Sequence, residues 1–427
     1  MNRDEQHEQL VRTGPGTPMG ELFRRYWLPA LLAKELDGPG GDPVRVQLLS
    51  ERLIAFRDSE GRLGAVDEFC AHRGVSLWFG RNEEGGLRCP YHGWKYDVNG
   101  HCLEVPSEAP GSTLHQRMGL KSYPLVERGG VIWIYMGPAD SRPALPEFEF
   151  AMVPDPHRYV GKRLQETNFL QAMEGGIDPH HVGFLHSSEL RHDPLIGSSN
   201  TAKYIRADLE VKTEVQRTEG GLVIAYARPA EDGNAYWRLM QWVMPCFTLI
   251  PPFAEHAVHG HFWVPIDDEH CWVWTYDYHP GRPLTPSERE GAAEGKGMHA
   301  KLVPGTFRPV ANRQNDYLMN RDAQRSRRSY SGIEGVAMQD ASLQESMGPI
   351  QDRRREHLVS SDKAIVAARR RLLDAATALQ GGAEPPGLRP RAQRVRSATA
   401  LLPLDCAPVE AVRESLIARE GVPFLST

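Results

Sequence analysis

The chain has 427 residues, of which 40% are hydrophobic and 25% charged, and its formal net charge at pH 7 is −5. This length predicts two domains, or one large domain with an appended module. The slightly acidic balance argues against a protein that binds nucleic acid or an anionic membrane, and apolar runs such as residues 131–136 are too short to span a bilayer. Because residues 1–10 are polar and acidic, they do not form a secretory signal, and we expect a cytoplasmic protein.

Residues 1–41 are predicted to form a helical arm. Residues 14–18 contain two glycines and two prolines and predict a turn, and residues 19–34 have apolar spacing that is compatible with a helix. From Val44 onwards the apolar residues alternate with polar ones, and Asn99 with Gly100 is a strong signal for a β-hairpin. Residues 42–145 are therefore predicted to form a small antiparallel β domain.

Two loops of this β domain carry residues that bind metals. Each loop contributes one cysteine and one histidine, and sixteen residues separate the two pairs: Cys70 and His72, then Cys89 and His92. Two thiolates and two imidazoles suit a Rieske [2Fe–2S] cluster. A structural zinc site is the alternative, but zinc motifs usually place both cysteines before both histidines. Gly74 and Gly93 also favour the cluster, because glycine lets backbone amides approach the cluster sulfurs.

Proline-rich stretches at 138–146 and 154–156 indicate a domain boundary, so residues 146–427 are predicted to form a second domain. We expect a helical segment over 168–186 and a strand-rich region over 203–280, with strands near 222–227, 237–244 and 261–265. A second helical region carries Asp340. The last helix is predicted over 362–380, with Ser361 or Asp362 as its cap and Gly381 at its end.

The segment 174–186 contains three histidines beside two acidic residues. Two imidazoles and one carboxylate are the ligands of non-haem Fe(II) oxygenases, and they leave coordination positions open. Three pairings of His180, His181 and His186 are possible, and we choose His181 with His186. Five residues turn side chains about 140° apart on an ideal helix, so the helix must distort or end there, which Gly183 permits. Spacing alone leaves a metal site and ordinary buried histidines equally favoured.

Asp178 lies three residues before His181 and is expected on the same helix face. A carboxylate behind a ligating histidine fixes its tautomer and its ring orientation. The alternative for Asp178 is a structural role as a helix cap, because Pro179 fits best as the first residue of a helix.

Two clusters of three arginines lie at residues 353–355 and 369–371. They are interpreted as a solvated helix face or an ion-pair surface between subunits, and a docking patch for an acidic redox partner is the alternative.

Together these motifs resemble the α subunits of Rieske non-haem iron oxygenases. The pattern is Cys-x-His-x16-Cys-x2-His followed by Glu-x3-Asp-x2-His-x4-His, and segments 14–20, 344–350 and 361–362 are similar to the phthalate dioxygenase branch. The resemblance covers nearly the whole chain. It implies an α+β fold in which the antiparallel β Rieske domain (42–145) precedes a catalytic domain (146–427) with a helix-flanked antiparallel sheet. The arm (1–41) would pack on the catalytic domain.

The resemblance also implies roles for single residues. Cys70, His72, Cys89 and His92 would hold the cluster. His181, His186 and a distant aspartate would hold mononuclear iron, and Asp340 fits because it lies in a Gln-Asp-x4-Glu segment. Asp178 would connect His92 of one subunit to His181 of the next and so carry electrons between the two sites. If Asp340 is not the ligand, the next choices are Asp316, Asp322 and Glu345.

The implied function is that of a terminal oxygenase component, which uses O2 and delivered electrons to hydroxylate an aromatic, carboxylated substrate by phthalate-type ring dihydroxylation. The alternatives are O-demethylation of a methoxylated aromatic acid and a Rieske electron carrier without oxygenase activity. The chain has no Gly-rich dinucleotide fingerprint after a strand. A separate NAD(P)H-dependent reductase, alone or with a ferredoxin, is therefore expected. The family assembles as head-to-tail trimers or stacked hexamers.

An arginine would bind the substrate carboxylate in a bidentate manner. Arg206 and Arg238 lie in the strand-rich region that is expected to line the pocket. The alternative for each is an exposed arginine on a strand.

Overall fold

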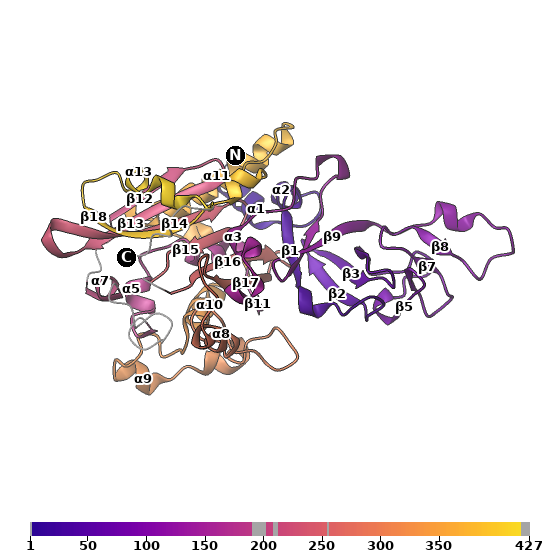
Figure 1. Ribbon diagram of the computed structural model, residues 1–427, viewed down its shortest axis with the longest axis horizontal. Coiled ribbons are helices and arrows are strands. Elements are labelled where there is room, and N and C mark those ends of the chain that lie inside the picture. The colour runs from indigo at the N-terminus through magenta and orange to yellow at the C-terminus, as the bar shows by residue number, and fades with distance from the viewer. Residues whose placement is uncertain (1, 190–201, 208–211, 254–255, 420–427) are drawn as a thin grey trace.

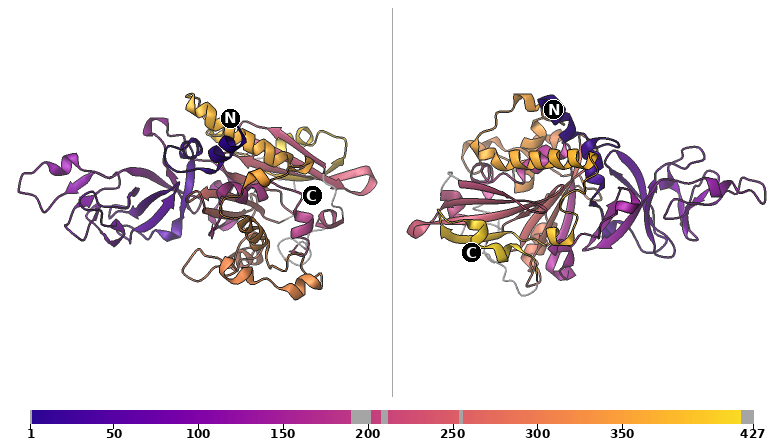
Figure 2. Two further views of the ribbon diagram at one scale, coloured as in Figure 1. Left: turned by 180° about the vertical axis from the view of Figure 1, so that it is seen from behind. Right: turned by 90° about the horizontal axis from the view of Figure 1, so that it is seen from above.

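The computed structural model describes residues 2–189, 202–207, 212–253 and 256–419. The molecule is elongated, with a β-rich lobe from the first third of the chain at one end and a larger mixed lobe at the other (Figures 1 and 2). The predicted α+β class is confirmed. Within the described residues no helix combines the length and the apolar character needed to cross a membrane, and the cytoplasmic location stays a prediction.

The β-rich lobe contains two antiparallel sheets. The larger one has the strand order β1-β10-β9-β4-β3-β2 and the smaller one the order β5-β6-β7-β8. The predicted hairpin at Asn99 and Gly100 connects β7 to β8, and Gly100 has the positive φ of 78° that such a turn needs. The strands are β1 (Trp27–Leu32), β2 (Val44–Leu48), β3 (Glu51–Arg57), β4 (Leu63–Asp67), β5 (Arg81–Glu83), β6 (Gly86–Arg88), β7 (Lys95–Tyr96), β8 (Cys102–Glu104), β9 (Ser122–Arg128) and β10 (Val131–Tyr135).

The helix predicted over 19–34 is wrong beyond its first turns. Helix α2 (Pro18–Arg24) ends early, and the next residues form β1, which pairs with β10. Pro29 has no amide hydrogen for a helix, and all six residues of β1 are buried, as in a strand that is covered on both faces. The arm therefore adds an edge strand to the larger sheet. The domain boundaries after residues 41 and 145 stay a prediction.

The mixed lobe is built on an eight-stranded antiparallel sheet with the order β11-β17-β16-β15-β14-β13-β12, and β18 pairs with part of β14. The strands predicted near 222–227, 237–244 and 261–265 are confirmed as β13, β14 and β16. The bounds are β11 (Arg158–Gln165), β12 (Lys212–Arg217), β13 (Gly221–Pro229), β14 (Asn234–Val243), β15 (Phe247–Ile250), β16 (Val258–Pro265), β17 (Cys271–Tyr278) and β18 (Ala398–Pro403).

Helices cover this sheet, as expected. Alternate residues of β13 point to opposite faces: Ile224 joins the core under α4 (Phe169–Gly175) and α11 (Lys363–Gln380), whereas Val223 packs with Val412 and Leu416 near the C-terminus. Helix α11 confirms the predicted last helix, with Asp362 at its N-cap and Gly381 at its C-cap. The other helices are α1 (Arg3–Val11), α3 (Glu149–Met152), α5 (Val182–Leu185), α7 (Ala202–Ala207), α8 (Pro286–Ala293), α9 (Arg321–Arg325), α10 (Val336–Ser346), α12 (Pro390–Gln393) and α13 (Pro408–Ala411).

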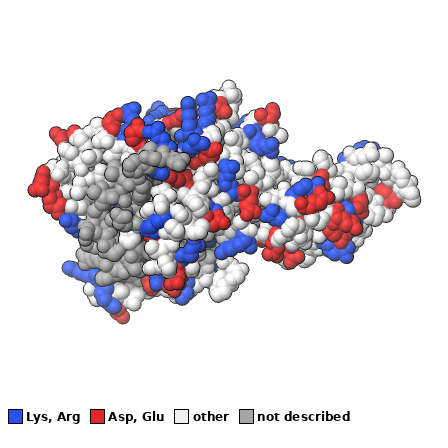
Figure 3. Space-filling view, in the orientation of Figure 1, with Lys and Arg blue, Asp and Glu red and all other residues white. Residues whose placement is uncertain are grey.

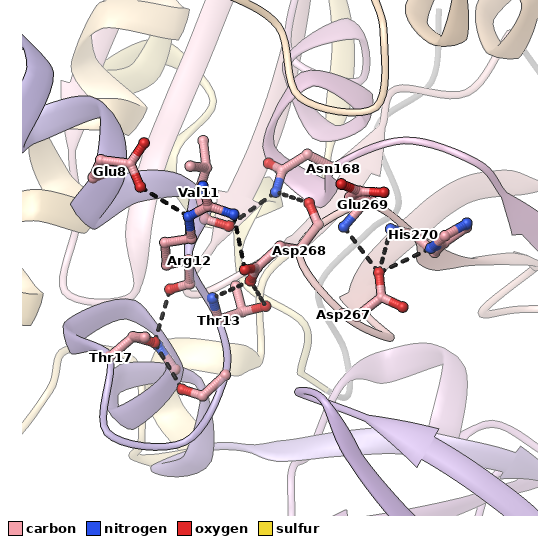
Figure 4. Close-up of polar contacts among 12 residues, drawn as sticks. Glu8, Val11, Arg12, Thr13, Thr17, Asn168, Asp267, Asp268, Glu269 and His270 are labelled. Atoms are coloured by element: carbon pink, nitrogen blue, oxygen red, sulfur yellow. Dashed lines mark hydrogen bonds and ion pairs between the residues drawn. The ribbon is translucent and has the colours of Figure 1, made fainter.

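The N-terminal arm is fastened to the mixed lobe by polar contacts (Figure 4). Asp268, in the β16–β17 loop, accepts hydrogen bonds from the Thr13 amide (2.8 Å) and the Arg12 guanidinium (3.1 Å). The side chain of Asn168 donates to the carbonyl oxygen of Val11 at 3.0 Å. Helices α1 and α2 also pack on α11. The arm thus positions α4, which leads into the site described below.

A buried ion pair connects the arm to the β-rich lobe. Arg24 lies 2.7 Å from Glu51, their side chains are only 5% and 10% exposed, and Glu51 also accepts hydrogen bonds from Lys121 and Tyr123. Burial alone would raise the pKa of Glu51, but these hydrogen bonds outweigh it and lower the pKa below 4.5. The pair therefore stabilises the fold above that pH, and this contribution is lost as the pH falls through the lowered pKa.

Glu51→Ala is expected to lower the free energy of unfolding by about 3–5 kcal/mol, because it leaves the Arg24 charge buried without its anionic partner. Denaturant unfolding at pH 7 measures the change. The control is Glu127→Ala, which removes an ion pair of the same length (2.7 Å) in which the carboxylate side chain is 45% exposed. We expect less than about 1 kcal/mol there. Equal losses in both variants would contradict the role of burial.

Candidate metal centres and active site

The two loops of the β-rich lobe that carry cysteine and histidine have matching backbone geometry. In each loop the cysteine amide donates to a carbonyl five residues on, and the amide of a glycine four residues on donates back to the cysteine carbonyl. Both glycines have positive φ angles, 72° at Gly74 and 76° at Gly93. The hydrogen bonds are Cys70 to Val75 (2.9 Å) and Gly74 to Cys70 (2.9 Å), and Cys89 to Trp94 (2.8 Å) and Gly93 to Cys89 (3.0 Å).

These loops bring together the four predicted side chains. Cys70 and Cys89 are buried, at 3% and 2% exposed, and the rings of His72 and His92 lie 4.5 Å apart. Burial raises the pKa of the Cys89 thiol, and the neighbouring Cys70 raises it further. Two adjacent buried thiols become thiolates when a cation binds them. The donor set therefore fits an iron–sulfur cluster held by two sulfur and two nitrogen atoms.

The helix predicted over 168–186 is wrong, because the chain breaks it in the middle. Helix α4 ends at Gly175, and the short helix α5 begins only at Val182. A Cβ atom on Gly176 would lie 2.0 Å from the Trp263 ring, so the chain passes too close to β16 for any larger residue. His181 and His186 are the N-cap and the C-cap of α5, so a helix does end before His186, but Gly183 lies inside that helix and does not break it.

Three predicted side chains meet beside α5. His181, His186 and Asp340 each direct one donor atom into a space in which all three atoms lie within 4.8 Å of one another. Nε2 of His186 lies 3.1 Å from Nε2 of His181 and 3.2 Å from Oδ1 of Asp340. Helix α10 supplies Asp340 from 154 residues further along the chain than His186. Two imidazoles and one carboxylate in this arrangement fit a mononuclear iron site with open positions.

The other ring nitrogen, Nδ1, of His181 and of His186 also has a hydrogen-bond partner. Nδ1 of His181 lies 3.1 Å from Oδ2 of Asp178, and Nδ1 of His186 lies 2.7 Å from Oε1 of Gln339. When Nδ1 donates to these oxygens, each Nε2 has a lone pair that points at the shared space. Gln339 precedes Asp340 in the predicted motif, but the sequence carried no signal for its contact with His186.

Electrostatics favour an ionised carboxylate beside the histidines. Burial alone would raise the pKa of Asp340, but the nearby His186 and His181 lower it to about 2. Burial opposes protonation of His181, yet its hydrogen bond with Asp178 outweighs this and raises the His181 pKa. Asp178 thus places a negative charge at Nδ1 of His181, behind one of the three donor side chains.

The three donor atoms open into a pocket between the sheet, α4 and α10. Arg238, predicted from the sequence, lines it, and its guanidinium is held by the hydroxyls of Tyr226 (3.0 Å) and Tyr236 (3.3 Å). Arg206 lies in α7, and its side chain is outside the described residues. Arg163, Arg228 and His261 were missed, because strand pairing brings them here from three separate strands. Other lining residues are Met240, Ile205, Phe253, Trp263, Val273 and Glu189.

The alternatives named from the sequence lie elsewhere. Nε2 of His180 contacts the Thr213 hydroxyl at 3.1 Å. Asp316 and Asp322 are exposed, and Glu345 accepts a hydrogen bond from the Tyr317 hydroxyl at 2.6 Å. None of these three acids belongs to the group of donor atoms found among the described residues.

Both arginine clusters take part in ion pairs within the chain. Arg369 contacts Glu174 and Glu356 at 2.6 Å, and Arg353 contacts Glu174 at 3.0 Å. Figure 3 shows basic side chains over this region with acidic ones beside them. These two side chains are only 8% and 13% exposed and their partners belong to the same chain, so neither a solvated helix face nor an ion-pair surface between subunits describes them.

Comparison with known proteins agrees with both centres. Residues 26–124 match the family model for the Rieske [2Fe-2S] domain, and residues 134–403 match the model described as LigXa C-terminal domain like. The chain is 38% identical over 395 residues to the 3-chlorobenzoate-3,4-dioxygenase oxygenase subunit of Comamonas testosteroni, with 90% of each chain covered. It is also 38% identical to the phthalate 4,5-dioxygenase oxygenase subunit of Pseudomonas putida, over 88% of this chain and 87% of that one.

A solved structure has the same fold. Dicamba monooxygenase bound to 3,6-dichlorosalicylic acid superposes with a TM-score of 0.59 at 19% identity, over 84% of this chain and 99% of the other. The fold and both centres are those of an iron-dependent oxygenase with its own iron–sulfur cluster. The chain belongs to the Rieske non-haem iron oxygenases.

Several expectations are thereby confirmed. The protein is an enzyme, the oxygenase component of its system, and its cofactors are a Rieske [2Fe–2S] cluster and a mononuclear iron. A solved structure with a TM-score of 0.57 and 20% identity, over 86% of this chain and 92% of the other, contains the oxygenase of carbazole 1,9a-dioxygenase in complex with a ferredoxin. The two alternative interpretations, a structural zinc site and a Rieske electron carrier without oxygenase activity, are therefore rejected.

Proposed function

We propose that Cys70, His72, Cys89 and His92 hold the cluster, and that His181, His186 and Asp340 hold the mononuclear iron. The matched loops and the three converging donor atoms support these assignments. When bound, the iron supplies the chemistry that activates O2 for attack on an organic substrate. Asp178 and Gln339 orient the two imidazoles, and the buried pocket keeps water away from the reacting atoms.

The proposed substrate is an aromatic carboxylic acid, and the proposed reaction is cis-dihydroxylation of its ring. The charge of the pocket supports an anionic substrate most directly. The guanidinium groups of Arg163, Arg228 and Arg238 face three carboxylates in the lining, and iron(II) would add two positive charges. An anionic substrate would offset this excess of positive charge. The two relatives described above are named for chlorobenzoate and phthalate, which are both aromatic carboxylates.

Arg238 is the proposed carboxylate anchor. Its guanidinium is buried, stacks 4.1 Å above the Phe253 ring and is fixed by four hydrogen bonds, among them one from Nη2 to the Pro251 carbonyl at 2.5 Å. A cation held in this way is in place before the substrate arrives, which lowers the entropic cost of binding. The apolar lining beside it would hold the ring.

We further propose head-to-tail trimers, with stacked hexamers as the larger form. In one chain the cysteine and histidine loops lie in the β-rich lobe, and α5 lies far from them in the other lobe of an elongated molecule (Figures 1 and 2). A neighbouring chain would have to bring its cluster close to Asp178. The proposed electron donor is an NAD(P)H-dependent reductase, alone or with a ferredoxin.

Product analysis tests the proposed reaction. The purified protein with a surrogate reductase, NADH and O2 is given a panel of carboxylated and methoxylated arenes. We expect a cis-dihydrodiol from a benzoate or phthalate substrate. Release of formaldehyde from a methoxylated acid, without diol from any acid, would instead identify O-demethylation and overturn ring dihydroxylation.

Arg238→Gln is expected to raise KM for the carboxylated substrate about 10–100-fold, because a hydrogen bond between charged groups contributes about 1.5–3 kcal/mol. KM for the matching neutral methyl ester should not change. The control is Arg217→Gln in β12, whose partner Asp374 lies 3.3 Å away and whose side chain is 53% exposed. An equal loss for acid and ester would show that Arg238 only supports the pocket wall.

A further inference from the structure

Behind the pocket lies a buried group of titratable side chains that the proposed ligand set does not use. Asp277 of β17 contacts two imidazoles: Nδ1 of His259 at 2.5 Å and Nε2 of His299 at 2.8 Å. His259 and Asp277 are each 3% exposed and His299 is 6% exposed. The two histidines outweigh burial and hold the pKa of Asp277 far below its usual range. The carboxylate is therefore ionised between two rings that can each carry a proton.

One end of this group reaches a second cavity. His299 lines a space of about 890 Å³, together with Tyr159, Thr275 and Lys296. Arg163 and Glu189 line both this cavity and the active-site pocket, so the two spaces are neighbours. A proton taken up in the second cavity can therefore reach His299.

The other end points toward the active site. His259 pairs with Asp277 across β16 and β17, and the next pair on the same face is His261 with Thr275. His261 lines the active-site pocket and is 8% exposed, and its Nδ1 is buried without a hydrogen-bond partner among the described residues. Two residues along a strand are roughly 7 Å apart at their Cα atoms, and one or two water molecules can bridge such a separation.

The chemistry of the pocket requires protons. Ring cis-dihydroxylation consumes one O2, two electrons and two protons, and both oxygen atoms end as hydroxyl groups on ring carbons. Hydroxylation of a methyl group consumes the same reactants and releases one water. Because the pocket is buried, these protons need a path. Burial and the nearby Arg163 lower the pKa of His261 to about 3, so a protonated His261 would be a strong acid beside the substrate.

We propose that His299, Asp277 and His259 form a proton relay that runs from the second cavity to His261 at the wall of the active-site pocket. A proton enters at His299, crosses the Asp277 carboxylate to His259 and passes through water to His261. The two rings contact different oxygens of Asp277, so the carboxyl group takes the proton on Oδ2 and must rotate to release it to His259. Each imidazole takes up a proton on one ring nitrogen and releases one from the other, and its ring turns back before the next proton passes. This inference rests on the proposed oxygenase reaction, because it names the source of the protons that the reaction uses.

Two variants test the relay in the complete oxygenase with its reductase. His299→Ala should lower product turnover about tenfold or more and divert O2 to peroxide. Added imidazole should restore at least a third of the turnover, because the second cavity has room for it. Asp277→Asn keeps the shape but cannot pass a proton, and we expect its solvent deuterium isotope effect on turnover to be at least twice that of the wild type. Normal turnover in either variant would overturn the relay.

A second test of the relay does not depend on catalytic turnover. Exchange of the ring C2 hydrogen, followed by mass spectrometry, reports the protonation of each histidine. Asp277→Asn should change the exchange rates of His259 and His299 together. Unchanged rates at either ring would overturn their coupling through Asp277.

The control is His270→Ala, which removes a histidine that pairs with Asp267 at 2.9 Å on the β16–β17 loop (Figure 4). This pair is partly exposed, and its loss should change neither turnover nor the response to imidazole. If His299→Ala is inactive, keeps the thermal stability of the wild type and does not respond to imidazole, the relay is wrong and the group is structural. If wild-type protein forms no product from aromatic acids, the proposed substrate fails, and the relay is then tested on reductase-driven O2 consumption.

Discussion

Asp340→Ala is expected to purify with its cluster but without mononuclear iron, at about two irons per chain in place of three. The three donor atoms lie within 4.8 Å of one another, so removing one leaves two imidazoles to hold the ion. It also removes the only carboxylate charge in that group, which offsets part of the charge of iron(II). Product formation should fall roughly a thousandfold or more, equivalent to about 4 kcal/mol in the barrier.

Iron analysis and electron paramagnetic resonance measure the two centres separately. The signal of the reduced cluster should match that of the wild type, because Asp340 is not one of the four residues that are proposed to hold the cluster. The control is Asp316→Ala, one of the alternative acids, which is exposed. It should retain about three irons and full activity. Full iron occupancy in Asp340→Ala would mean that another acid completes the site.

The cluster loops could be predicted because all their determinants are local. In each loop a glycine of positive φ follows the cysteine by four residues, the histidine follows it by two or three, and the same hydrogen bonds close both loops. The hairpin at Gly100 and helix α11 were predicted for the same reason, since a turn signal or a cap marks their ends. Where the pattern of neighbouring residues decides the structure, the sequence alone is sufficient.

Predictions from the sequence were wrong where contacts with residues far along the chain decide the structure. Residues 27–32 looked helical, but they form a strand because β10 offers hydrogen bonds and the lobes bury both faces. At Gly176, where α4 ends, the chain passes directly against the Trp263 ring, which lies almost ninety residues further along the chain. Arg163 and His261 could not be assigned to the pocket, because each reaches it only through the pairing order of the sheet.

Asp178→Asn is expected to keep both metal sites filled and to slow electron transfer between them about a hundredfold or more, equivalent to about 2.7 kcal/mol. One carboxylate oxygen accepts from the His180 amide at 2.8 Å, and the other lies 3.1 Å from Nδ1 of His181. These bonds outweigh burial and lower the pKa of Asp178, so it is an anion at neutral pH. Asparagine keeps the size of the side chain but removes the negative charge beside Nδ1 of His181, and with it the proposed connection to a neighbouring chain.

Stopped-flow absorbance measures how fast O2 and substrate reoxidise the reduced cluster. The control is Asp362→Asn, which removes a nearby carboxylate at the N-cap of α11 and should reoxidise at the wild-type rate. Rapid reoxidation in Asp178→Asn would count against the bridge.

Mixed assemblies decide whether the electron crosses between chains. Cys70→Ser chains should lack a cluster but keep Asp178, whereas Asp178→Asn chains keep the cluster but lack the bridge. If electrons pass from the cluster of one chain to His181 of the next, trimers co-expressed from both variants contain intact pairs at their junctions and regain part of the activity. If electrons stay within one chain, no chain in the mixture is complete, and activity stays at the level of the single variants. Recovery in the mixture would therefore establish that the active site is shared between subunits.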